Sequence, residues 1–350
     1  MKRIAIFQKD LAIGGIQRSL LNMITNMDLT SYEVDLFLFA EPEICRKEEL
    51  KNINIHIIRP LFYFNRLIKF STLQKMFRYD LPEKEYDIAI DFNSYSNECA
   101  LCTFAVKAKK RIMWIHNDVR IEHKNSGKYR ILWNNFKDKF DLYDEFVAVS
   151  DGIVEPFRAM TGIKDKKITV IPNIINTVRL IRKSHEEIDF RVDPYTTNFI
   201  FVGRFTHQKG IDILLDYFAR ALEKRSDIHL YLLGSGPEEL KIAQQIENQK
   251  FNDHVTVIPA VKNPYPYMAM MDSLVLTSRH EGQGMVLWEA KALGLDLIFE
   301  KHLEKYNEGL SGSEDIVEAI VNQKKHSKQF DTLDYYNLKI KNSLYELFDR

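Results

Sequence analysis

Short apolar runs alternate with amphipathic helical stretches along most of the chain. An almost wholly apolar run bounded by turn residues predicts a buried strand, and apolar residues spaced three and four apart predict a helix. The strands predicted in the first half are Arg3–Phe7, Glu33–Phe39, Asn54–Ile58, Ile88–Asp91, Arg111–Ile115 and Phe146–Val149. Those predicted in the second half are Phe199–Val202, His229–Leu233, Val255–Ile258, Ser273–Leu276 and Leu297–Phe299. This alternation indicates an α/β protein with doubly wound parallel sheets.

Two domains are expected from the length and from one polar stretch. A chain of 350 residues is long enough for about two domains, each with its own core. The stretch from Asn173 to Thr197 is rich in Glu and Lys and separates the two sets of strands. We therefore predict one Rossmann-like domain over residues 1–173 and a second over residues 174–332. Residues 333–350 carry apolar positions at helical spacing, which predicts a last helix from Leu333 to Phe348.

The charge balance argues against a nucleic-acid partner. Lys plus Arg and Asp plus Glu each number 49, so the formal net charge is zero. Residues 59–139 hold 16 Lys or Arg against 9 Asp or Glu, an excess that suggests one basic face in the first half. No signal peptide is recognised, and no apolar run approaches the length of a membrane span. We expect a cytoplasmic protein, either soluble or peripheral to a membrane.

The three cysteines, Cys45, Cys99 and Cys102, indicate a reducing compartment rather than a disulfide framework. Cys99 and Cys102 have the spacing of a redox or metal motif, but no second pair completes a zinc site. The run around them is apolar, so we predict buried cysteines on a helix.

The segment Glu281–Glu289 carries the most informative chemistry. It follows the predicted strand Ser273–Leu276, passes through two glycines, and enters a helix that we expect to begin at about Met285. In an open α/β sheet, ligands bind at the carboxyl ends of the strands, where helix N-termini present free N–H groups to anions. Glu281 and Glu289 are suited to binding sugar hydroxyls. The alternative is an ordinary surface loop and helix face.

Two further loops have the chemistry of a diphosphate site. Arg204 and Lys209 lie five positions apart after the strand Phe199–Val202, and two such cations can converge on one diphosphate. Near the N-terminus, Gly14 and Gly15 join a strand to a helix, a geometry that brings backbone amides close to a phosphate. The alternatives are a solvated basic loop and a simple turn.

Together these segments resemble the motifs of retaining nucleotide-sugar glycosyltransferases of family 4. The resemblance rests on the Glu-x7-Glu pair, the Gly-Arg-x4-Lys-Gly element at Gly203–Gly210, and the N-terminal loop with Gly14 and Gly15. Lesser matches occur at His116, Phe146–Ser150, Val170–Asn173 and Gly234–Pro237. The resemblance spans the chain from Met1 to about Leu295 and implies the GT-B fold, with two Rossmann-like domains facing across a cleft. It also implies that the terminal helix packs back on the first domain.

The resemblance assigns roles to particular residues. Catalysis would involve Glu281, His116, Arg204 and Lys209. Donor binding would involve Gly14, Gly15, Gly203, Gly234, Val261, Gly282, Gln283, Gly284, Met285, Val286 and Glu289. The donor is expected to be a uridine diphosphate sugar. No Asp-x-Asp motif occurs, so no cofactor and no metal are expected, and the positive side chains would stabilise the leaving diphosphate.

The acceptor is expected to be a glycan or lipid-linked polymer of a bacterial cell surface, on resemblance alone. The segment 61–78, with Arg66, Lys69 and Lys75, mixes apolar and basic residues and would suit an anionic membrane or an ordinary packed helix. The segment 295–310 departs from the family pattern, and we expect it to affect the acceptor side and not the donor motifs. A non-catalytic partner subunit and a nucleotide-sugar epimerase are the alternative functions.

Overall fold

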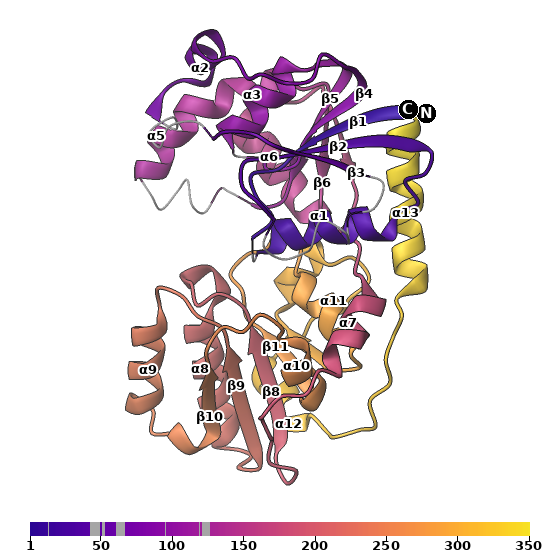
Figure 1. Cartoon of the computed structure of the whole chain (residues 1–350). Helices are drawn as coiled ribbons and strands as arrows, with labels where there is room; N and C mark the ends of the chain where they lie inside the picture. The colour runs from indigo at the N-terminus through magenta and orange to yellow at the C-terminus, as the bar shows by residue number, and fades with distance from the viewer. Residues whose placement is uncertain are drawn as a thin grey trace. The chain divides into compact units, whose positions relative to one another are not determined.

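The computed structural model describes residues 1–12, 14–42, 50, 53–60, 67–94, 96–118, 120 and 127–350. The chain divides into two compact units. The first contains Met1–Ile174 together with Tyr335–Arg350, and the second contains Ile175–Asp334. Figure 1 shows both units and the labels of their elements. Cys45 and the segment 61–66, which includes Arg66, lie outside the described residues.

Within the described residues, the first unit contains a parallel sheet of seven strands in the order β3-β2-β1-β4-β5-β6-β7. The strands are β1 (Lys2–Phe7), β2 (Tyr32–Leu38), β3 (Ile53–Ile57), β4 (Glu85–Asp91), β5 (Lys107–Ile115), β6 (Glu145–Ala148) and β7 (Lys167–Val170). The chain order reverses between β1 and β4, which are neighbours in the sheet. The carboxyl end of this pair is the switch point at which open α/β sheets bind ligands.

The helices of the first unit include the C-terminal one. They are α1 (Gly15–Asn26), α2 (Phe70–Met76), α3 (Asn97–Ala105), α5 (Gly127–Phe136), α6 (Val154–Thr161) and α13 (Asp334–Asp349), with short 3-10 turns η3 (Lys137–Leu142) and η4 (Asp151–Ile153). Helix α13 buries Ile340, Leu344 and Leu347, and Lys2 Nζ donates to the carbonyl of Phe348 at 3.2 Å. The two chain ends therefore lie side by side (Figure 1).

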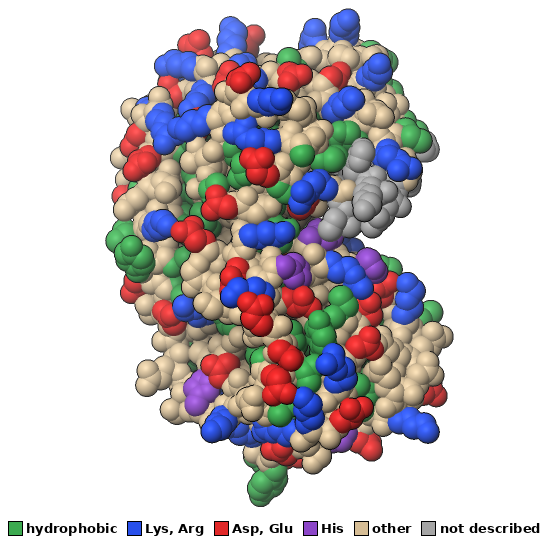
Figure 2. All heavy atoms as spheres, turned by 180° about the vertical axis from the view of Figure 1, so that it is seen from behind, with side chains coloured by type: hydrophobic (Ala, Val, Ile, Leu, Met, Phe, Trp, Pro, Cys, Tyr) green, Lys and Arg blue, Asp and Glu red, His purple; other side chains and the backbone are tan. Residues whose placement is uncertain are grey.

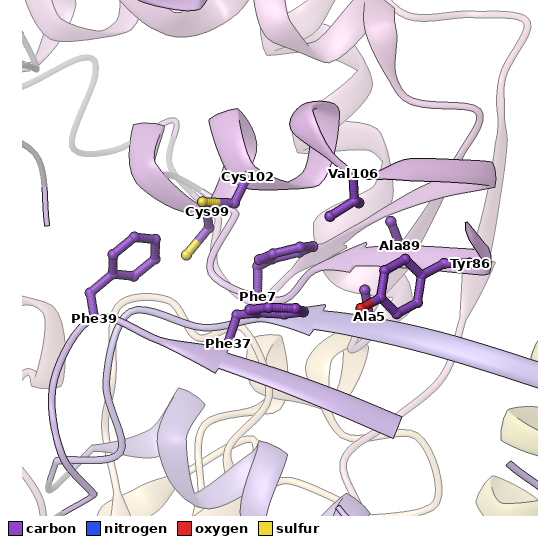
Figure 3. Packing of buried hydrophobic residues seen from close by; sticks show 9 residues of the cluster. All are labelled: Ala5, Phe7, Phe37, Phe39, Tyr86, Ala89, Cys99, Cys102 and Val106. Atoms are coloured by element: carbon purple, nitrogen blue, oxygen red, sulfur yellow. The ribbon is translucent and has the colours of Figure 1, made fainter. Parts of the chain in front are cut away.

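Helix α3 covers the centre of the first sheet. Phe7 of β1 and Phe37 of β2 stack with ring centroids 4.7 Å apart, and Cys99 and Cys102 of α3 belong to the same buried cluster (Figure 3). Both thiols are free and fully buried. Burial raises the pKa of each thiol, so neither is a reactive thiolate at neutral pH. The prediction of buried helix cysteines is confirmed for this pair.

The second unit contains a parallel sheet in the order β10-β9-β8-β11-β12. Its strands are β8 (Thr197–Val202), β9 (Ile228–Leu233), β10 (Val255–Ile258), β11 (Ser273–Leu276) and β12 (Asp296–Phe299). Its helices are α7 (Thr177–Ser184), α8 (Ile211–Leu222), α9 (Glu239–Asn248), α10 (Tyr265–Met270), α11 (Met285–Ala292) and α12 (Ile316–Asn322), with 3-10 turns η5 (His207–Lys209), η6 (Asn252–His254) and η7 (Lys301–Tyr306). The chain order reverses between β8 and β11, so the loops after these two strands meet at the switch point.

Strand β7 and helix α7 are among the elements that were not predicted. Strand β7 has the sequence Lys-Ile-Thr-Val and is half-exposed at the edge of its sheet, so its apolar signal is weak. Helix α7 lies inside the polar stretch interpreted as a boundary. It buries Thr177, Leu180 and Ser184 and leaves Arg182 exposed. A short, basic helix with so few buried residues could not be distinguished from a linker in the sequence.

Strands β4 and β5 begin several residues earlier than predicted. Their first halves carry charged residues that pair across the sheet. Lys109 contacts Asp87 at 2.7 Å, and Lys110 contacts Glu145 at 2.6 Å. Oppositely charged neighbours on adjacent strands allow a strand to extend beyond its apolar core.

The surface carries both charge signs. Lys and Arg side chains are interspersed with Asp and Glu on the face shown in Figure 2, in keeping with the zero net charge. Within the described part of the chain, no helix has both the length and the apolar character needed to cross a bilayer.

Candidate active site

The second unit brings two predicted site residues into direct contact. Lys209 ends the loop after β8, and Glu281 lies in the loop after β11. Lys209 Nζ lies 2.7 Å from Glu281 Oε1. The side chain of Glu281 is 6% exposed and that of Lys209 is 21% exposed. A cation and a carboxylate are therefore held together at the switch point of this sheet, within the donor-binding half that the motifs predicted.

Glycines let the strand-end loops approach backbone to backbone. Gly234, after β9, has a φ of +157°, and a Cβ atom there would collide with the carbonyl oxygen of Gly203. Gly210 has a φ of +63°, and a Cβ atom there would collide with the carbonyl oxygen of Thr277 after β11. Only glycine combines these conformations with such close contacts. The loops after β8, β9 and β11 are thereby fixed against one another.

The glycine turn before α11 contains Gly282, Gln283 and Gly284, and Met285 and Val286 begin the helix. Gly282 and Gly284 are buried, whereas Gln283, Met285 and Val286 are half-buried. The N–H of Gly284 donates to Asn307 Oδ1 at 3.1 Å, and the N–H of Met285 donates to the carbonyl of Gln283 at 2.9 Å. Both amides already have acceptors, so a ligand would have to displace these acceptors or bind other groups of the turn.

Asn307 corrects one expectation about the segment 295–310. We expected its departure from the family pattern to leave the donor motifs untouched, but Asn307 is 1% exposed and bonds to Gly284. His302 Nε2 also lies 3.0 Å from the carbonyl oxygen of Ser278. The reason is topological, because β12 lies beside β11 and ends at the same edge of the sheet. The atypical segment therefore supports the turn that carries Glu281.

Glu289 is held by a tyrosine whose role the sequence did not reveal. The carboxylate lies on α11 and is 5% exposed. The hydroxyl of Tyr265, the first residue of α10, donates to Glu289 Oε1 at 3.0 Å. Val261 lies half-buried in the loop between β10 and α10. The helix that follows the loop of Val261 is therefore bonded to Glu289, and both Val261 and Glu289 are predicted donor-binding residues. The only signal for Tyr265 in the sequence was its position at the start of a helix.

Arg204 differs from Lys209 in its surroundings. It is exposed in the loop between β8 and η5, and its guanidinium makes no ion pair with the described residues. Gly203, beside it, donates its N–H to the carbonyl of Leu233 at 3.1 Å. The backbone before Arg204 is therefore held by this hydrogen bond, while its side chain is exposed to solvent.

In the first unit, Gly14 and Gly15 lie at the start of α1, the first helix after β1. Gly14 is the N-cap residue in an extended conformation, and no side chain caps the helix. Gly15 is exposed, and a Cβ atom there would meet nothing within 4 Å. The first N–H groups of a helix have no acceptor inside the helix. The start of α1 therefore offers accessible donors beside the switch point between β1 and β4.

His116 follows β5 in the same unit and is 5% exposed. Its Nε2 lies 2.9 Å from the carbonyl oxygen of Phe92, which follows β4. Because a carbonyl only accepts, Nε2 carries the proton and Nδ1 is an acceptor in the neutral ring. Burial lowers the pKa of His116 to about 3, although the hydrogen bond to Phe92 opposes this shift. The imidazole is therefore neutral at physiological pH.

Metal ligands are not gathered in the described residues. No group of three or more His, Cys, Asp or Glu side chains there is arranged to hold an ion. The residues with site chemistry are instead the paired Lys209 and Glu281, the buried Glu289, and the exposed Arg204.

Comparison with known families identifies the class of protein. Residues 13–179 match the family described as Glycosyltransferase Family 4, and residues 184–304 match the family described as Glycosyl transferases group 1. Between them these matches cover most of the chain. The chain belongs to glycosyltransferase family 4 and is a glycosyltransferase by class. Its two parallel α/β sheets are those of the GT-B fold, as the motifs predicted.

Relatives and solved structures agree with this class. The lipopolysaccharide 1,6-galactosyltransferase of Escherichia coli is 25% identical over 339 residues, which are 92% of this chain and 84% of that protein. An uncharacterised glycosyltransferase of Methanocaldococcus jannaschii is 25% identical over 193 residues, and the chain spans 47% of its length. The crystal structure of HepE from Anabaena, in complex with UDP and glucose, has a TM-score of 0.68 at 16% identity, with both chains wholly covered.

Proposed function

We propose that this protein is a retaining glycosyltransferase that moves a hexose or N-acetylhexosamine from a uridine diphosphate sugar to a growing glycan or lipid-linked acceptor. The acceptor belongs to a bacterial cell-surface polysaccharide, such as a capsule, an exopolysaccharide or a teichoic-type polymer. The observation that carries the proposal is the contact between Lys209 and Glu281. It supports the proposal because Lys209 is a cation suited to a diphosphate, Glu281 is a carboxylate suited to sugar hydroxyls, and the two are in contact at the switch point of the second sheet.

The donor would be held by groups of both charge signs. Arg204 and Lys209 bind the diphosphate, because guanidinium and ammonium groups suit phosphate oxygens. Glu281 accepts hydrogen bonds from hydroxyls of the donor sugar, and Glu289 accepts them from the ribose. Gly14 and Gly15 add backbone donors to the diphosphate, since an uncapped helix N-terminus favours anions.

The reaction exchanges one glycosidic bond for another. The bond between the anomeric carbon and the diphosphate oxygen breaks, and its electron pair leaves with the nucleoside diphosphate. The acceptor hydroxyl attacks the same face of the sugar, and its proton passes to the leaving phosphate oxygen. Arg204 and Lys209 stabilise the charge that grows on this leaving group, and preorganised donors of this kind contribute about 10²–10³ each in rate. Neutral His116, fixed by Phe92, contacts the donor sugar.

The nucleotide and the acceptor are supported by relatives. HepE, which shares the fold, binds UDP and glucose in its crystal structure. The similar Escherichia coli enzyme is a lipopolysaccharide galactosyltransferase. Backbone amides near Val261 suit a uracil ring, because the recognition of its edge needs no particular side chain.

We further propose that the enzyme acts in the cytoplasm, at the inner face of the plasma membrane. The side chains of Leu67 and Met76 are 58% and 62% exposed, and Lys69 and Lys75 beside them are exposed. Such a surface suits an anionic leaflet, to which each nearby cation contributes about 1 kcal/mol. Phe70 and Leu73 of α2 pack into a buried cluster with residues of α3, so only the opposite side of α2 is available to a membrane.

A donor screen by thermal shift tests the proposal. A ligand that binds only the folded protein at a hundred times its Kd stabilises it by about 2.7 kcal/mol. We expect UDP and at least one UDP-sugar, at millimolar concentration, to raise the midpoint, and GDP-sugars not to. A larger shift with GDP-sugars would contradict the uridine assignment. No shift with any nucleotide-sugar would contradict the enzyme assignment.

A further inference from the structure

A second ion pair joins the two loops that carry Lys209 and Glu281. Arg279 lies two residues before Glu281, and Asp212 lies three residues after Lys209, in the first turn of α8. The guanidinium of Arg279 donates to both carboxylate oxygens of Asp212, with Nη1 to Oδ1 at 2.9 Å and Nη2 to Oδ2 at 2.6 Å. Two parallel bonds fix the relative orientation of two groups, which a single point contact cannot do.

Further bonds connect the same two loops through the backbone. Arg279 donates from Nη1 to the carbonyl of His207 at 2.7 Å and from its N–H to the carbonyl of Gln208 at 2.8 Å. Gln208 Nε2 donates in return to the carbonyl of His280 at 3.0 Å. Thr277 Oγ1 donates to the carbonyl of Gly210 at 2.8 Å. The segment around Lys209 is therefore bonded, on both sides of this residue, to the part of the other loop that precedes Glu281.

This ion pair contributes more to geometry than to stability. The side chains of Arg279 and Asp212 are 26% and 45% exposed, and partly exposed ion pairs stabilise proteins little. The hydrogen bonds from Arg279 lower the pKa of Asp212, and Asp212 raises the pKa of Arg279, so both stay ionised at neutral pH. Because both side chains stay charged, the two hydrogen bonds between Arg279 and Asp212 fix the spacing of the loops that carry Lys209 and Glu281.

We propose that Arg279 and Asp212 are positioning residues of the donor site, which hold Lys209 where it meets the donor diphosphate. This inference rests on the proposed function, because it assumes that Lys209 binds a diphosphate. Neither Arg279 nor Asp212 contacts the donor itself. Their effect is on placement, and a misplacement of about 1 Å in a site of this kind costs about 10²-fold in rate.

The test compares how tightly variants bind UDP and uridine, which differ only in the diphosphate. Ligand-observed NMR titration suits it, because it reaches the weak affinity expected of uridine. For Arg279→Gln we expect uridine affinity to be unchanged and UDP affinity to fall about tenfold, as the loss of one charge-assisted contact implies. Arg279→Lys keeps the charge but not the fork, and should recover part of the loss. Asp212→Asn should behave like Arg279→Gln, and serves in its place if that variant does not fold.

Two controls separate placement from general loosening. Lys224 pairs with Glu318 beyond the far end of α8, so Lys224→Gln removes an exposed ion pair of the same unit and should leave both affinities unchanged. On a Lys209→Ala background, Arg279→Gln should cause no further loss in the ratio of UDP to uridine affinity. Such non-additivity is expected only when two residues act through the same contact.

Three results would overturn the inference. One is an unchanged ratio of UDP to uridine affinity in folded Arg279→Gln and Asp212→Asn. Another is an equal loss for both ligands, which would indicate a structural role alone. The third is full additivity with Lys209→Ala. If the unmodified protein binds uridine but gains nothing from the diphosphate, or binds neither ligand, the proposed function fails and this inference fails with it.

Discussion

Lys209 and Glu281, separated by 72 positions in the sequence, meet at 2.7 Å between Nζ and Oε1. Each compensates the charge of the other in the protein without donor. Because Glu281 is almost fully buried, removal of Lys209 would leave a carboxylate without its cation. Several predictions about the donor site depend on this pair and on its neighbours.

Arg204 and Lys209 are both proposed to bind the diphosphate, but they should differ in their contribution to the stability of the protein. Lys209→Ala and Arg204→Ala should each lower turnover by about two orders of magnitude, because both cations act on charge that grows in the transition state. Lys209→Ala should also lower the free energy of unfolding by about 1–3 kcal/mol, since it leaves Glu281 unpaired. Arg204→Ala should not, because Arg204 is exposed. Turnover assays and urea unfolding measure the two effects. A variant with the same turnover as the unmodified protein would show that its substituted residue does not belong to the site.

The two carboxylates should differ in the step that they affect. Glu281→Gln should reduce kcat strongly, because in the proposed site this carboxylate binds the reacting sugar. Glu289→Gln should mainly weaken nucleotide binding, because the ribose is remote from the bond that breaks. Tyr265→Phe, which removes the hydroxyl that bonds to Glu289, should reproduce a smaller part of the same loss.

Titration with UDP and with 2′-deoxy-UDP measures the ribose contribution directly. The discrimination between these nucleotides should shrink in Glu289→Gln and in Tyr265→Phe. Glu281→Gln is the matched control and should keep it. Equal discrimination in all four proteins would show that Glu289 does not bind the ribose.

Catalysis should not require a divalent metal. In the proposed mechanism, Arg204 and Lys209 supply the positive charge that a metal would otherwise bring to the leaving diphosphate. Turnover measured after dialysis against excess chelator should stay close to that of the untreated enzyme. Loss of turnover in chelator, with recovery on addition of magnesium or manganese, would contradict this account of the leaving group.

Stability should fall in mild acid because His116 is buried in its neutral form. Its pKa is lowered to about 3 in the folded protein, below the ordinary value of 6.5. Between these values the unfolded chain binds the extra proton, so stability rises with pH up to about 6.5 and then levels off for this residue. From about pH 7 to about pH 5 the contribution lost is about 2 kcal/mol.

His116→Gln is the matched variant, because it keeps an N–H donor for the carbonyl of Phe92 but does not titrate. Urea unfolding of both proteins at the two pH values gives the difference. The variant should lose less stability on acidification than the unmodified protein. An equal loss in both would show that His116 can be protonated without cost.

Membrane association should depend on the basic side of α2. Lys69 and Lys75 are exposed, so the protein should pellet with anionic liposomes at low salt and less so at high salt. Lys69→Glu with Lys75→Glu should abolish this. Lys109 is a suitable control, because it is paired with Asp87 and its reversal should matter less. Equal recovery of the protein in the supernatant with anionic and neutral liposomes would show that this surface does not bind an anionic membrane.

The sequence predicted the strands well because parallel strands buried on both faces are nearly continuous apolar runs. Val255–Ile258 and Ser273–Leu276 were predicted with their observed bounds. The charged first half of β5 and the edge strand β7 were missed, because their stability comes from neighbours across the sheet rather than from their own composition.

Local motifs pointed to the candidate site residues but not to the residues that contact them. The motifs containing Lys209 and Glu281 were recognised separately, yet nothing in either segment indicated that they form an ion pair. Asn307 and Tyr265 were missed for the same reason, since each acts on a glycine or a carboxylate from a different loop. Contacts between strand-end loops depend on sheet order, which local pattern alone does not determine.

The central claim is that the protein transfers a sugar from a nucleotide donor with retention of the anomeric configuration. Incubation with a UDP-sugar labelled in the sugar, in the presence of a membrane extract that supplies acceptors, tests it most directly. We expect the label in a new glycoside with the anomeric configuration of the donor, formed by the unmodified protein and about a hundredfold more slowly by Lys209→Ala. Label recovered as a free epimerised nucleotide-sugar, an inverted glycoside, or no turnover with any donor would contradict the account.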